Sequence, residues 1–275
     1  MLHFPNAKIN IGLFVTEKRE DGYHNLETIF FPLRMLKDAL EVLPAAEANE
    51  SSIRISGKSI DGDAQDNLVW KAFLLLQEQF PDKISPVQIH LLKSIPMGAG
   101  LGGGSSDGAF MLCLLNKFFN LELSDEDLLK LALQLGSDCP FFIYNTPQFA
   151  QGRGEILSPV VLDLSQYSIQ VICPKVHVST AAAFSKITPK PSPFNLVDIQ
   201  SLPVEQWKDF VFNDFEVPVF EIHPQLAEMK QKLYDDGALY ASMSGSGSAV
   251  YGIFREGKQS QSFSEYEDIE TYYFE

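Results

Sequence analysis

The chain has 275 residues, of which 45% are hydrophobic and 21% are charged, and this composition is typical of a globular protein with sizeable cores. The length allows one large domain or two domains of ~100–150 residues. The formal net charge of −15 and the lack of a basic patch argue against a nucleic-acid binder. An anionic substrate is not excluded, because a glycine-rich loop supplies positive potential locally.

The three cysteines, Cys113, Cys139 and Cys173, do not form a disulfide framework or a metal site, because their number is odd and no metal-ligand spacing appears. The first residues lack the basic start and apolar stretch of a signal peptide. The sequence contains no run of ~18 apolar residues, which is the length that a membrane span needs. We therefore expect a soluble, cytoplasmic protein without a metal-ligand cluster of its own.

Residues 7–15 predict a strand, because apolar side chains alternate with other side chains. Lys8, Asn10 and Gly12 share the face opposite the apolar one. A lysine beside an asparagine favours a cleft wall, although these residues alone leave a solvated strand face open.

The following segments predict a turn, further strands and a helix. The turn at residues 19–24 carries Tyr23 and His24, and taken alone it is only a polar loop. Strand patterns cover residues 26–43 and 53–55, and helical spacing runs from about Asn67 to Phe80.

Residues 96–107 contain five glycines within seven positions, between a strand pattern at 87–95 and an apolar run that favours a helix to about Phe119. Strand, glycine loop and helix form an anion site, because unpaired N–H groups and the positive end of the helix dipole meet there. Ser105 and Ser106 at the expected helix start would cap the helix or touch a phosphate.

Other interpretations of this glycine segment are weaker. A flexible linker is not normally placed between a strand and a strongly apolar helix. No Gly-Lys-Ser/Thr sequence closes the loop, so it differs from the common P-loop. The glycines are also too dense and too late in the chain for a dinucleotide fingerprint.

Asp138 follows a helix predicted at residues 125–135, which starts with a capping box at Ser124 and Asp127 and stops at Gly136. An acid between a helix end and an apolar run has two open interpretations. It is a turn former or, if it lies in a cleft, a proton acceptor.

The second half of the chain starts after a turn at residues 151–155, where we place the boundary between two lobes. A second glycine-serine loop at 243–249 leads into a strand, and such a loop alone more often connects a hairpin. The other elements expected are a strand at 167–174, a short helix at 179–186, a loop at 187–195, a helix from about Pro224 to Gly237 and strands at 250–254 and 271–274.

Four separated motifs occur in an order that resembles the GHMP kinase superfamily over nearly the whole chain. They are residues 5–10 with 21–24, residues 96–106, residues 135–141 and residues 243–247. The Lys-x-Asn start, the Asp-Gly-Tyr-His turn and residues 213–216 resemble the member of this family that phosphorylates a cytidine-diphosphate sugar alcohol in the non-mevalonate route to isoprenoids.

This resemblance implies an α+β fold with two lobes and the active site in the cleft between them. The N-terminal lobe, like the second domain of ribosomal protein S5, would cover residues 1–155, and an α/β-sandwich lobe would cover 156–275. The implied reaction moves the γ-phosphoryl group of ATP to a 2-hydroxyl and requires Mg²⁺. The implied partners are ATP and a cytidine-diphosphate sugar alcohol, with no nucleic acid or membrane, for a monomer or weak homodimer.

The resemblance also implies roles for individual residues. Asp138 would accept the proton of the attacking hydroxyl, and Lys8 would hold Asp138 ionised and steady charge on the transferring group. Ser106 would lie near Mg²⁺. The residues that would wrap the ATP phosphates are Pro96, Met97, Gly98, Ala99, Gly100, Leu101, Gly102, Gly103, Gly104, Ser105 and Ser106.

On the substrate side, Tyr23 and His24 would bind the cytosine ring, and Phe184 would supply the opposite stacking face. Asn10 would hold the substrate near the reacting hydroxyl, and the 243–247 loop would close against the phosphate site. Cys139, beside the expected base, is more typical of a small buried residue than of a reactive thiol. Residues 255–264 lack the helical spacing that the resemblance implies there.

Two alternatives stay open. Another GHMP kinase, acting on mevalonate, homoserine or a sugar, would have no need of Tyr23 and His24 arranged for a pyrimidine. A non-catalytic nucleotide-binding or regulatory protein on the same fold should have lost Lys8 or Asp138, and both are present.

Overall fold

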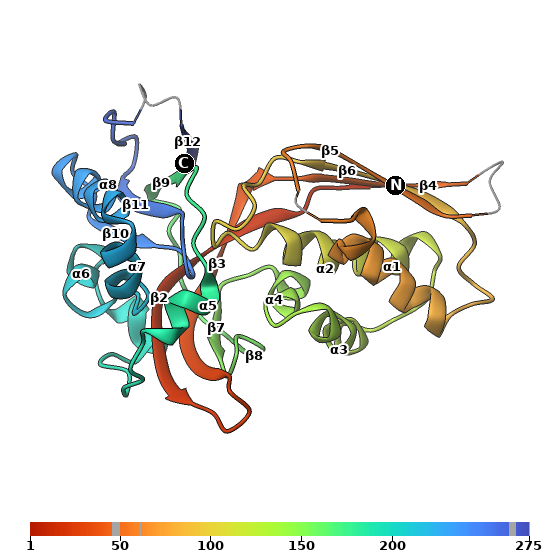
Figure 1. Ribbon diagram of the computed structural model, residues 1–275, viewed down its shortest axis with the longest axis horizontal. Helices are drawn as coiled ribbons and strands as arrows, with labels where there is room; N and C mark the ends of the chain where they lie inside the picture. The colour runs from red at the N-terminus through yellow and green to blue at the C-terminus, as the bar shows by residue number, and fades with distance from the viewer. Residues whose placement is uncertain (46–49, 61, 264–267, 275) are drawn as a thin grey trace. The chain divides into compact units, whose positions relative to one another are not determined.

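A computed structural model of the chain describes residues 1–45, 50–60, 62–263 and 268–274. Its contacts divide the chain into two compact units (Figure 1). Unit 1 contains Met1–Lys8, Pro32–Met97 and Gly102–Thr146, and unit 2 contains Ile9–Phe31, Gly98–Leu101 and Pro147–Glu275.

Unit 1 is built on a four-stranded sheet with the strand order β1-β4-β6-β5. β5 pairs with β6 in parallel, while the other neighbours are antiparallel. Val87, Ile89 and Leu91 of β6 point to the buried face. The strands are β1 (Leu2–His3), β4 (Ala39–Pro44), β5 (Ser52–Gly57) and β6 (Val87–Lys93).

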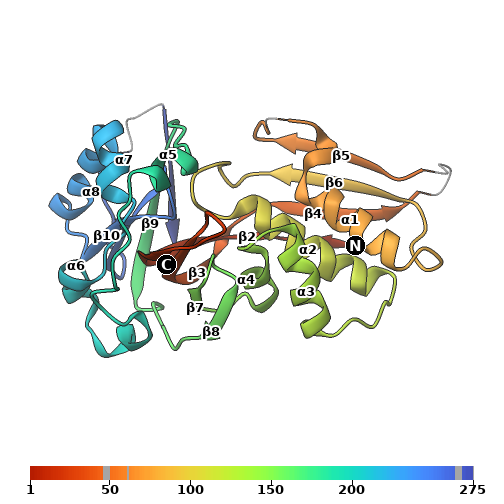
Figure 2. The same ribbon diagram turned by 60° about the horizontal axis from the view of Figure 1, so that its bottom comes forward.

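Helices cover one face of this sheet, as Figures 1 and 2 show for α1 and α2. Asn67 caps α1 by accepting a hydrogen bond from the Val69 N–H group, and Ser124 and Asp127 form the capping box of α3. The helices of unit 1 are α1 (Leu68–Gln79), α2 (Gly103–Phe118), α3 (Asp125–Leu135) and α4 (Cys139–Tyr144), with a 3₁₀ turn η1 (Ala64–Asp66).

Unit 2 contains an antiparallel sheet with the order β10-β11-β9-β12. A second sheet, β2-β3-β7-β8, takes residues 9–18 of β2 and 24–31 of β3 into this unit. The strands are β2 (Asn6–Lys18), β3 (His24–Lys37), β7 (Gln148–Gln151), β8 (Ile156–Pro159), β9 (Tyr167–Pro174), β10 (Tyr240–Met243), β11 (Val250–Arg255) and β12 (Ile269–Phe274).

The core of unit 2 joins β2 to segments far along the chain. Leu13 and Val15 of β2 pack in one buried cluster with Phe215, Leu226 and Leu233. The remaining elements are α5 (Thr180–Ser185), η2 (Leu196–Ser201), η3 (Val204–Gln206), α6 (Trp207–Phe210), α7 (Glu216–Ile222) and α8 (Pro224–Asp235).

Most elements expected from the sequence are confirmed, including the strand at 271–274, which pairs with β9 as part of β12. Three short helices, α4, α6 and α7, have no counterpart in the sequence prediction. Within residues 255–264, the described positions 255–263 contain no helix. Position 264 and part of the acidic tail, residues 265–267 and 275, lie outside the described residues.

The division into units differs from the expected boundary after residue 155. Residues 9–31 belong to unit 2, because the backbone of β2 bonds to later segments of the chain. The Leu13 N–H group donates to Phe212 O (2.9 Å), and the Asp214 N–H group donates to Leu13 O (2.8 Å).

None of the helices in the described ranges has both the length and the apolar character that a membrane span requires.

Candidate active site

Lys8 and Asp138 form an ion pair in unit 1, with 3.5 Å between Lys8 Nζ and Asp138 Oδ2. β2 carries Lys8, and Asp138 is the residue that precedes α4. The lysine is 3% exposed, whereas the side chain of Asp138 keeps 33% of its surface accessible. The solvated strand face is thus excluded for Lys8, and the carboxylate stays within reach of a ligand.

Burial lowers the pKa of Lys8 below its usual value of 10.5, and the nearby Asp138 carboxylate opposes this shift. A cation in such surroundings is only weakly screened, so it acts strongly on a neighbouring negative charge.

The side chain of Lys8 lies against the backbone of the glycine loop. Gly102, with φ +70°, starts α2, and a Cβ at this position would lie 3.0 Å from Lys8 Cγ and 3.0 Å from the Phe142 ring. Only a glycine accommodates both this conformation and this close approach. Lys8, Asp138 and Gly102 therefore meet in unit 1.

The expected capping role of Ser105 and Ser106 is wrong. Gly102 occupies the cap position without a side-chain hydrogen bond, and both serines lie inside the first turns of α2. The Ser106 hydroxyl is fully buried and makes no hydrogen bond within the described part of the chain.

Cys139, next to Asp138, is fully buried. Burial raises the pKa of its thiol to about 12, so the thiol stays protonated at neutral pH. The small buried residue is the better interpretation, and Cys113, Cys139 and Cys173 are all free thiols.

A buried charge cluster lies beneath the start of α2, and no sequence motif indicated it. Lys93 forms ion pairs with Asp38 and Asp107, at 2.6 Å for Asp107, and all three side chains are about 1% exposed or less. Asp38 also accepts hydrogen bonds from the N–H groups of Ser94 and Ile95. The cluster thus ties the end of β6 to the second turn of α2.

Asn10 is held by hydrogen bonds within unit 2 and is 3% exposed. Its side-chain amide donates to Thr28 Oγ1 (3.0 Å), and its backbone N–H donates to Ser244 Oγ (3.2 Å). The Tyr251 hydroxyl donates to its carbonyl oxygen at 2.8 Å. These contacts fix the orientation of Asn10.

His24 and Phe184 stack directly on each other, with ring centroids 5.0 Å apart and planes inclined by 19°. Phe215 contacts Phe184 edge-on at 4.7 Å. Tyr23 is 56% exposed, and the Arg153 guanidinium lies 4.9 Å from its ring centroid. These residues form a cluster of aromatic side chains around the turn at residues 19–24 in unit 2.

The second glycine-serine loop, residues 244–249, connects β10 to β11 and is therefore also a hairpin connection. It contacts Gly98–Leu101, the part of the glycine loop that belongs to unit 2. Ala249 N donates to Ala99 O (3.0 Å), and Ser244 Oγ donates to Gly100 O (2.8 Å).

Two residues that hold this loop, Asn213 and Glu216, received no role from the sequence. Asn213 is 2% exposed and Glu216 is 7% exposed. The available signal was the Asn-Asp-Phe-Glu sequence at residues 213–216, which entered the sequence analysis only as part of the family resemblance. Among the described residues, no group of three or more His, Cys, Asp or Glu side chains is arranged to hold a metal ion.

Comparison with known proteins gives the family. Residues 67–146 match the model of the GHMP kinases N terminal domain, and residues 200–266 match that of the GHMP kinases C terminal domain. A protein from Bacteroides thetaiotaomicron, named 4-diphosphocytidyl-2-C-methyl-D-erythritol kinase, is 53% identical over 255 residues, which cover 92% of each chain. A protein of the same name from Cytophaga hutchinsonii is 47% identical over 92% of each chain.

Solved structures agree with this grouping. A crystal structure of 4-(cytidine 5'-diphospho)-2C-methyl-D-erythritol kinase superposes with a TM-score of 0.77 at 34% identity, over 92% of this chain and 90% of that chain. The mevalonate kinase of Methanococcus jannaschii has a TM-score of 0.72 at 15% identity, over 99% and 97% of the two chains, which is a likeness of fold alone. The fold is thus the α+β fold of these enzymes, and the chain belongs to the GHMP kinase family.

Proposed function

We propose that this chain transfers the γ-phosphoryl group of ATP to the 2-hydroxyl of 4-diphosphocytidyl-2-C-methyl-D-erythritol. The observation that carries the proposal is the Lys8–Asp138 ion pair against the backbone of Gly102. A base, a cation and a phosphate loop are the parts that phosphoryl transfer to an alcohol needs. Relatives that are 46–53% identical carry the name of this kinase, which supports the choice of substrate.

In this reaction Asp138 accepts the proton of the substrate hydroxyl. The freed oxygen forms a bond to the γ-phosphorus, while the bond from that phosphorus to the bridging oxygen breaks and ADP leaves with the electron pair. Lys8 stabilises the negative charge on the transferring group, and its weak screening makes this interaction strong. Little covalent chemistry is left for the protein, so the rest of the site positions the reactants.

Residues 96–106 bind the ATP phosphates through backbone N–H groups in this proposal. Mg²⁺ in kinases is typically held by one or two side chains together with the phosphates. The Ser106 hydroxyl fits such a ligand, because it is buried and makes no hydrogen bond within the described chain. When bound, the ion neutralises phosphate charge.

The cytosine ring binds at the aromatic turn. A ring sandwiched between His24 and Phe184 would require two stacking contacts in series, each with a centroid separation of at least about 4.5 Å. The 5.0 Å between these rings leaves no such room. We therefore propose that the base stacks on the exposed ring of Tyr23, and that Phe184 holds the His24 ring so that its edge hydrogen-bonds the base.

Asn10 contacts the substrate near the reacting hydroxyl. We further propose that the protein acts on these small molecules in the cytoplasm, as a monomer or weak homodimer. Its free cysteines are compatible with a reducing compartment.

The test is ADP formation with a panel of acceptors. Turnover should appear with 4-diphosphocytidyl-2-C-methyl-D-erythritol and not with mevalonate or homoserine, and equal turnover of all three would remove the specificity. Asp138→Asn should lower kcat at least ~10²-fold, as loss of a general base does. The exposed Asp163→Asn serves as the matched control and should keep the wild-type rate.

The aromatic turn has its own arm of this experiment. Tyr23→Ala and His24→Ala should raise KM for the cytidine-containing substrate and leave KM for ATP within about twofold, because each removes one contact to the base. A selective loss of ATP affinity would place these residues in the nucleotide site instead.

A further inference from the structure

The first half of the glycine loop is built on the second glycine-serine loop. Besides the hydrogen bonds from Ala249 and Ser244, the two loops touch backbone to backbone. Gly100 has φ +78°, and a Cβ there would clash with the carbonyl of Ser244. A Cβ on Gly245 would lie 3.3 Å from Gly100 Cα. The conformation of Gly98–Leu101 therefore depends on where residues 244–249 lie.

Asn213 holds the entrance of the second loop. Its side-chain amide donates two hydrogen bonds, to Met243 O and to Gly245 O, both at 2.8 Å. Its Oδ1 accepts from the N–H group of Phe215 at 2.9 Å. These three hydrogen bonds connect the Asn213 side chain, which is 2% exposed, to backbone groups. The amide therefore fixes the backbone conformation on both sides of Ser244.

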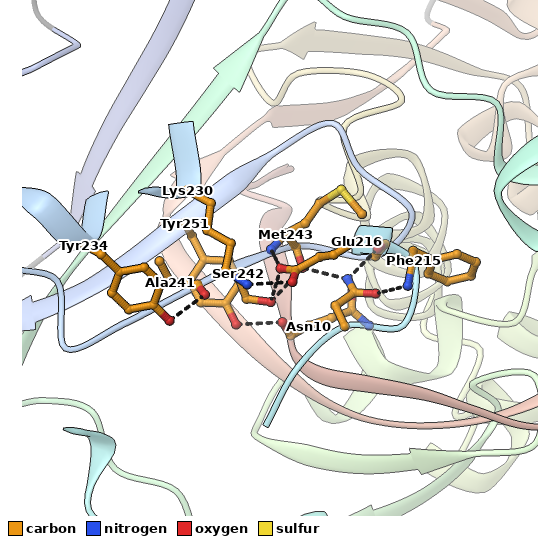
Figure 3. Close-up of polar contacts among 11 residues, drawn as sticks. Asn10, Phe215, Glu216, Lys230, Tyr234, Ala241, Ser242, Met243 and Tyr251 are labelled. Atoms are coloured by element: carbon orange, nitrogen blue, oxygen red, sulfur yellow. Dashed lines mark hydrogen bonds and ion pairs between the residues drawn. The ribbon is translucent and has the colours of Figure 1, made fainter. Parts of the chain in front are cut away.

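Glu216 holds the last residues of β10, as Figure 3 shows. Its Oε1 accepts from Met243 N (2.9 Å) and from Ser242 Oγ (3.0 Å), and its Oε2 accepts from Lys230 Nζ (2.6 Å). A carboxylate that is 7% exposed needs such partners, and the Lys230 ammonium supplies the balancing charge.

We propose that Asn213 and Glu216 are positioning residues for the nucleotide, acting through residues 244–249 on the backbone of Gly98–Leu101. The proposal rests on the proposed function, in which this loop binds the ATP phosphates. Backbone N–H groups bind a phosphate well only when they are held in place beforehand, and a displacement of about 1 Å at a distance can cost ~10² in rate.

Calorimetry of ADP binding in the presence of Mg²⁺ tests this proposal. The measurements are made at a temperature at which the wild type and the variants are all folded. Asn213→Ala should weaken ADP binding about tenfold, because two hydrogen bonds to the loop are lost. The matched control is Asn116→Ala. The Asn116 side-chain amide also bonds to backbone, donating to Leu123 O and accepting from Leu123 N. The Asn116→Ala variant should therefore have a lower thermal stability and an unchanged dissociation constant for ADP.

Ser244→Ala removes only a hydroxyl group. It serves as the test variant if Asn213→Ala does not fold. It should also weaken ADP binding, and the double variant should be less than additive, because both changes act on the same loop. Wild-type affinity for ADP in both single variants would overturn the proposal. Failure of the wild-type protein to bind ADP would instead contradict the proposed function.

Glu216 is tested by rescue. Glu216→Gln keeps an oxygen for Met243 N and Ser242 Oγ, so it should bind ADP within about twofold of the wild type. Glu216→Ala loses this acceptor and should resemble Asn213→Ala. Equal loss of affinity in the Gln and Ala variants would overturn the role of the Glu216 oxygen in positioning.

Discussion

Lys8 carries its charge where almost no solvent reaches it, and this environment has a kinetic consequence. Burial lowers the pKa of Lys8 below 10.5. A lysine with a lowered pKa is charged only below that pKa, so activity that needs the ammonium is present at lower pH and is lost as the pH rises through the lowered value. We predict an alkaline decline of kcat/KM that is complete at a lower pH than an exposed lysine would give.

The pH profile of kcat/KM between about pH 7 and 10 measures this decline, because kcat/KM reports the groups of the free enzyme. Lys8→Met should lower kcat at least ~10²-fold and abolish the decline, because no ammonium is left to titrate. The exposed Lys71→Met is the control and should keep the wild-type profile. A Lys8→Met profile that still declines as in the wild type would assign the titration to another group.

The sequence indicated Lys8 and Asp138 through separate motifs, but the residues alone left each of them two interpretations. Burial decides for Lys8, whose side chain lies against Gly102, a residue distant in sequence. For Asp138, the 3.5 Å between its Oδ2 and Lys8 Nζ supports the proposed role as proton acceptor. A period-2 pattern reports which residues share a face and cannot report what covers that face.

At the scale of elements, the Lys93 cluster fastens β6 to α2. Removing the lysine would leave the carboxylates of Asp38 and Asp107 buried without their cation. We predict that Lys93→Met lowers the free energy of unfolding by about 3–5 kcal/mol, which is typical when one partner of a buried ion pair is lost. Urea unfolding at pH 7 measures the loss.

Asp107→Asn is a second variant that tests this cluster. Burial, more than the neighbouring Asp38, raises the pKa of Asp107 well above 3.8. The folded state therefore resists ionisation of this acid, so the contribution of Asp107 to wild-type stability falls as the pH rises from about 4 towards the raised pKa. The amide has no such cost, and the stability of Asp107→Asn relative to wild type should improve over this range. A pH-independent difference would contradict a raised pKa.

Elements with their own local signals were predictable, and those without them were not. The capping box at Ser124 marks the start of α3 in both sequence and structure. α4 has six residues, four of them buried, and shows no helical period that could be recognised. The start of α2 was placed at the serines because capping favours them, whereas Gly102 in a left-handed conformation starts the helix earlier.

At the scale of the whole molecule, the family and its α+β fold were predictable because four motifs occur in the order that the family has. Which residues belong to each unit was not predictable. Residues 9–31 belong to unit 2 through backbone pairing of Leu13 with residues near Asn213, some 200 positions later. No local pattern encodes such pairing, which depends on the register of distant segments.

The net charge of −15 is also a property of the whole molecule, and it opposes the approach of anionic ATP. Screening acts on this long-range repulsion, with a Debye length that falls from ~30 Å at 0.01 M to ~10 Å at 0.1 M ionic strength. Contacts between phosphates and loop N–H groups are shorter than this length and are screened much less. We predict that kcat/KM for ATP rises about twofold to fivefold between 10 and 150 mM NaCl at constant free Mg²⁺.

Lys71→Glu sharpens this prediction, because it makes the net charge more negative at an exposed position of α1. Its kcat/KM should be lower than that of the wild type at 10 mM NaCl and should converge with it at 150 mM, since screening removes the difference between the two fields. Thermal stability should be similar at both salt concentrations, which separates association from folding. A kcat/KM that falls with salt would mean that positive potential around the glycine loop, rather than the charge of the whole chain, governs the encounter with ATP.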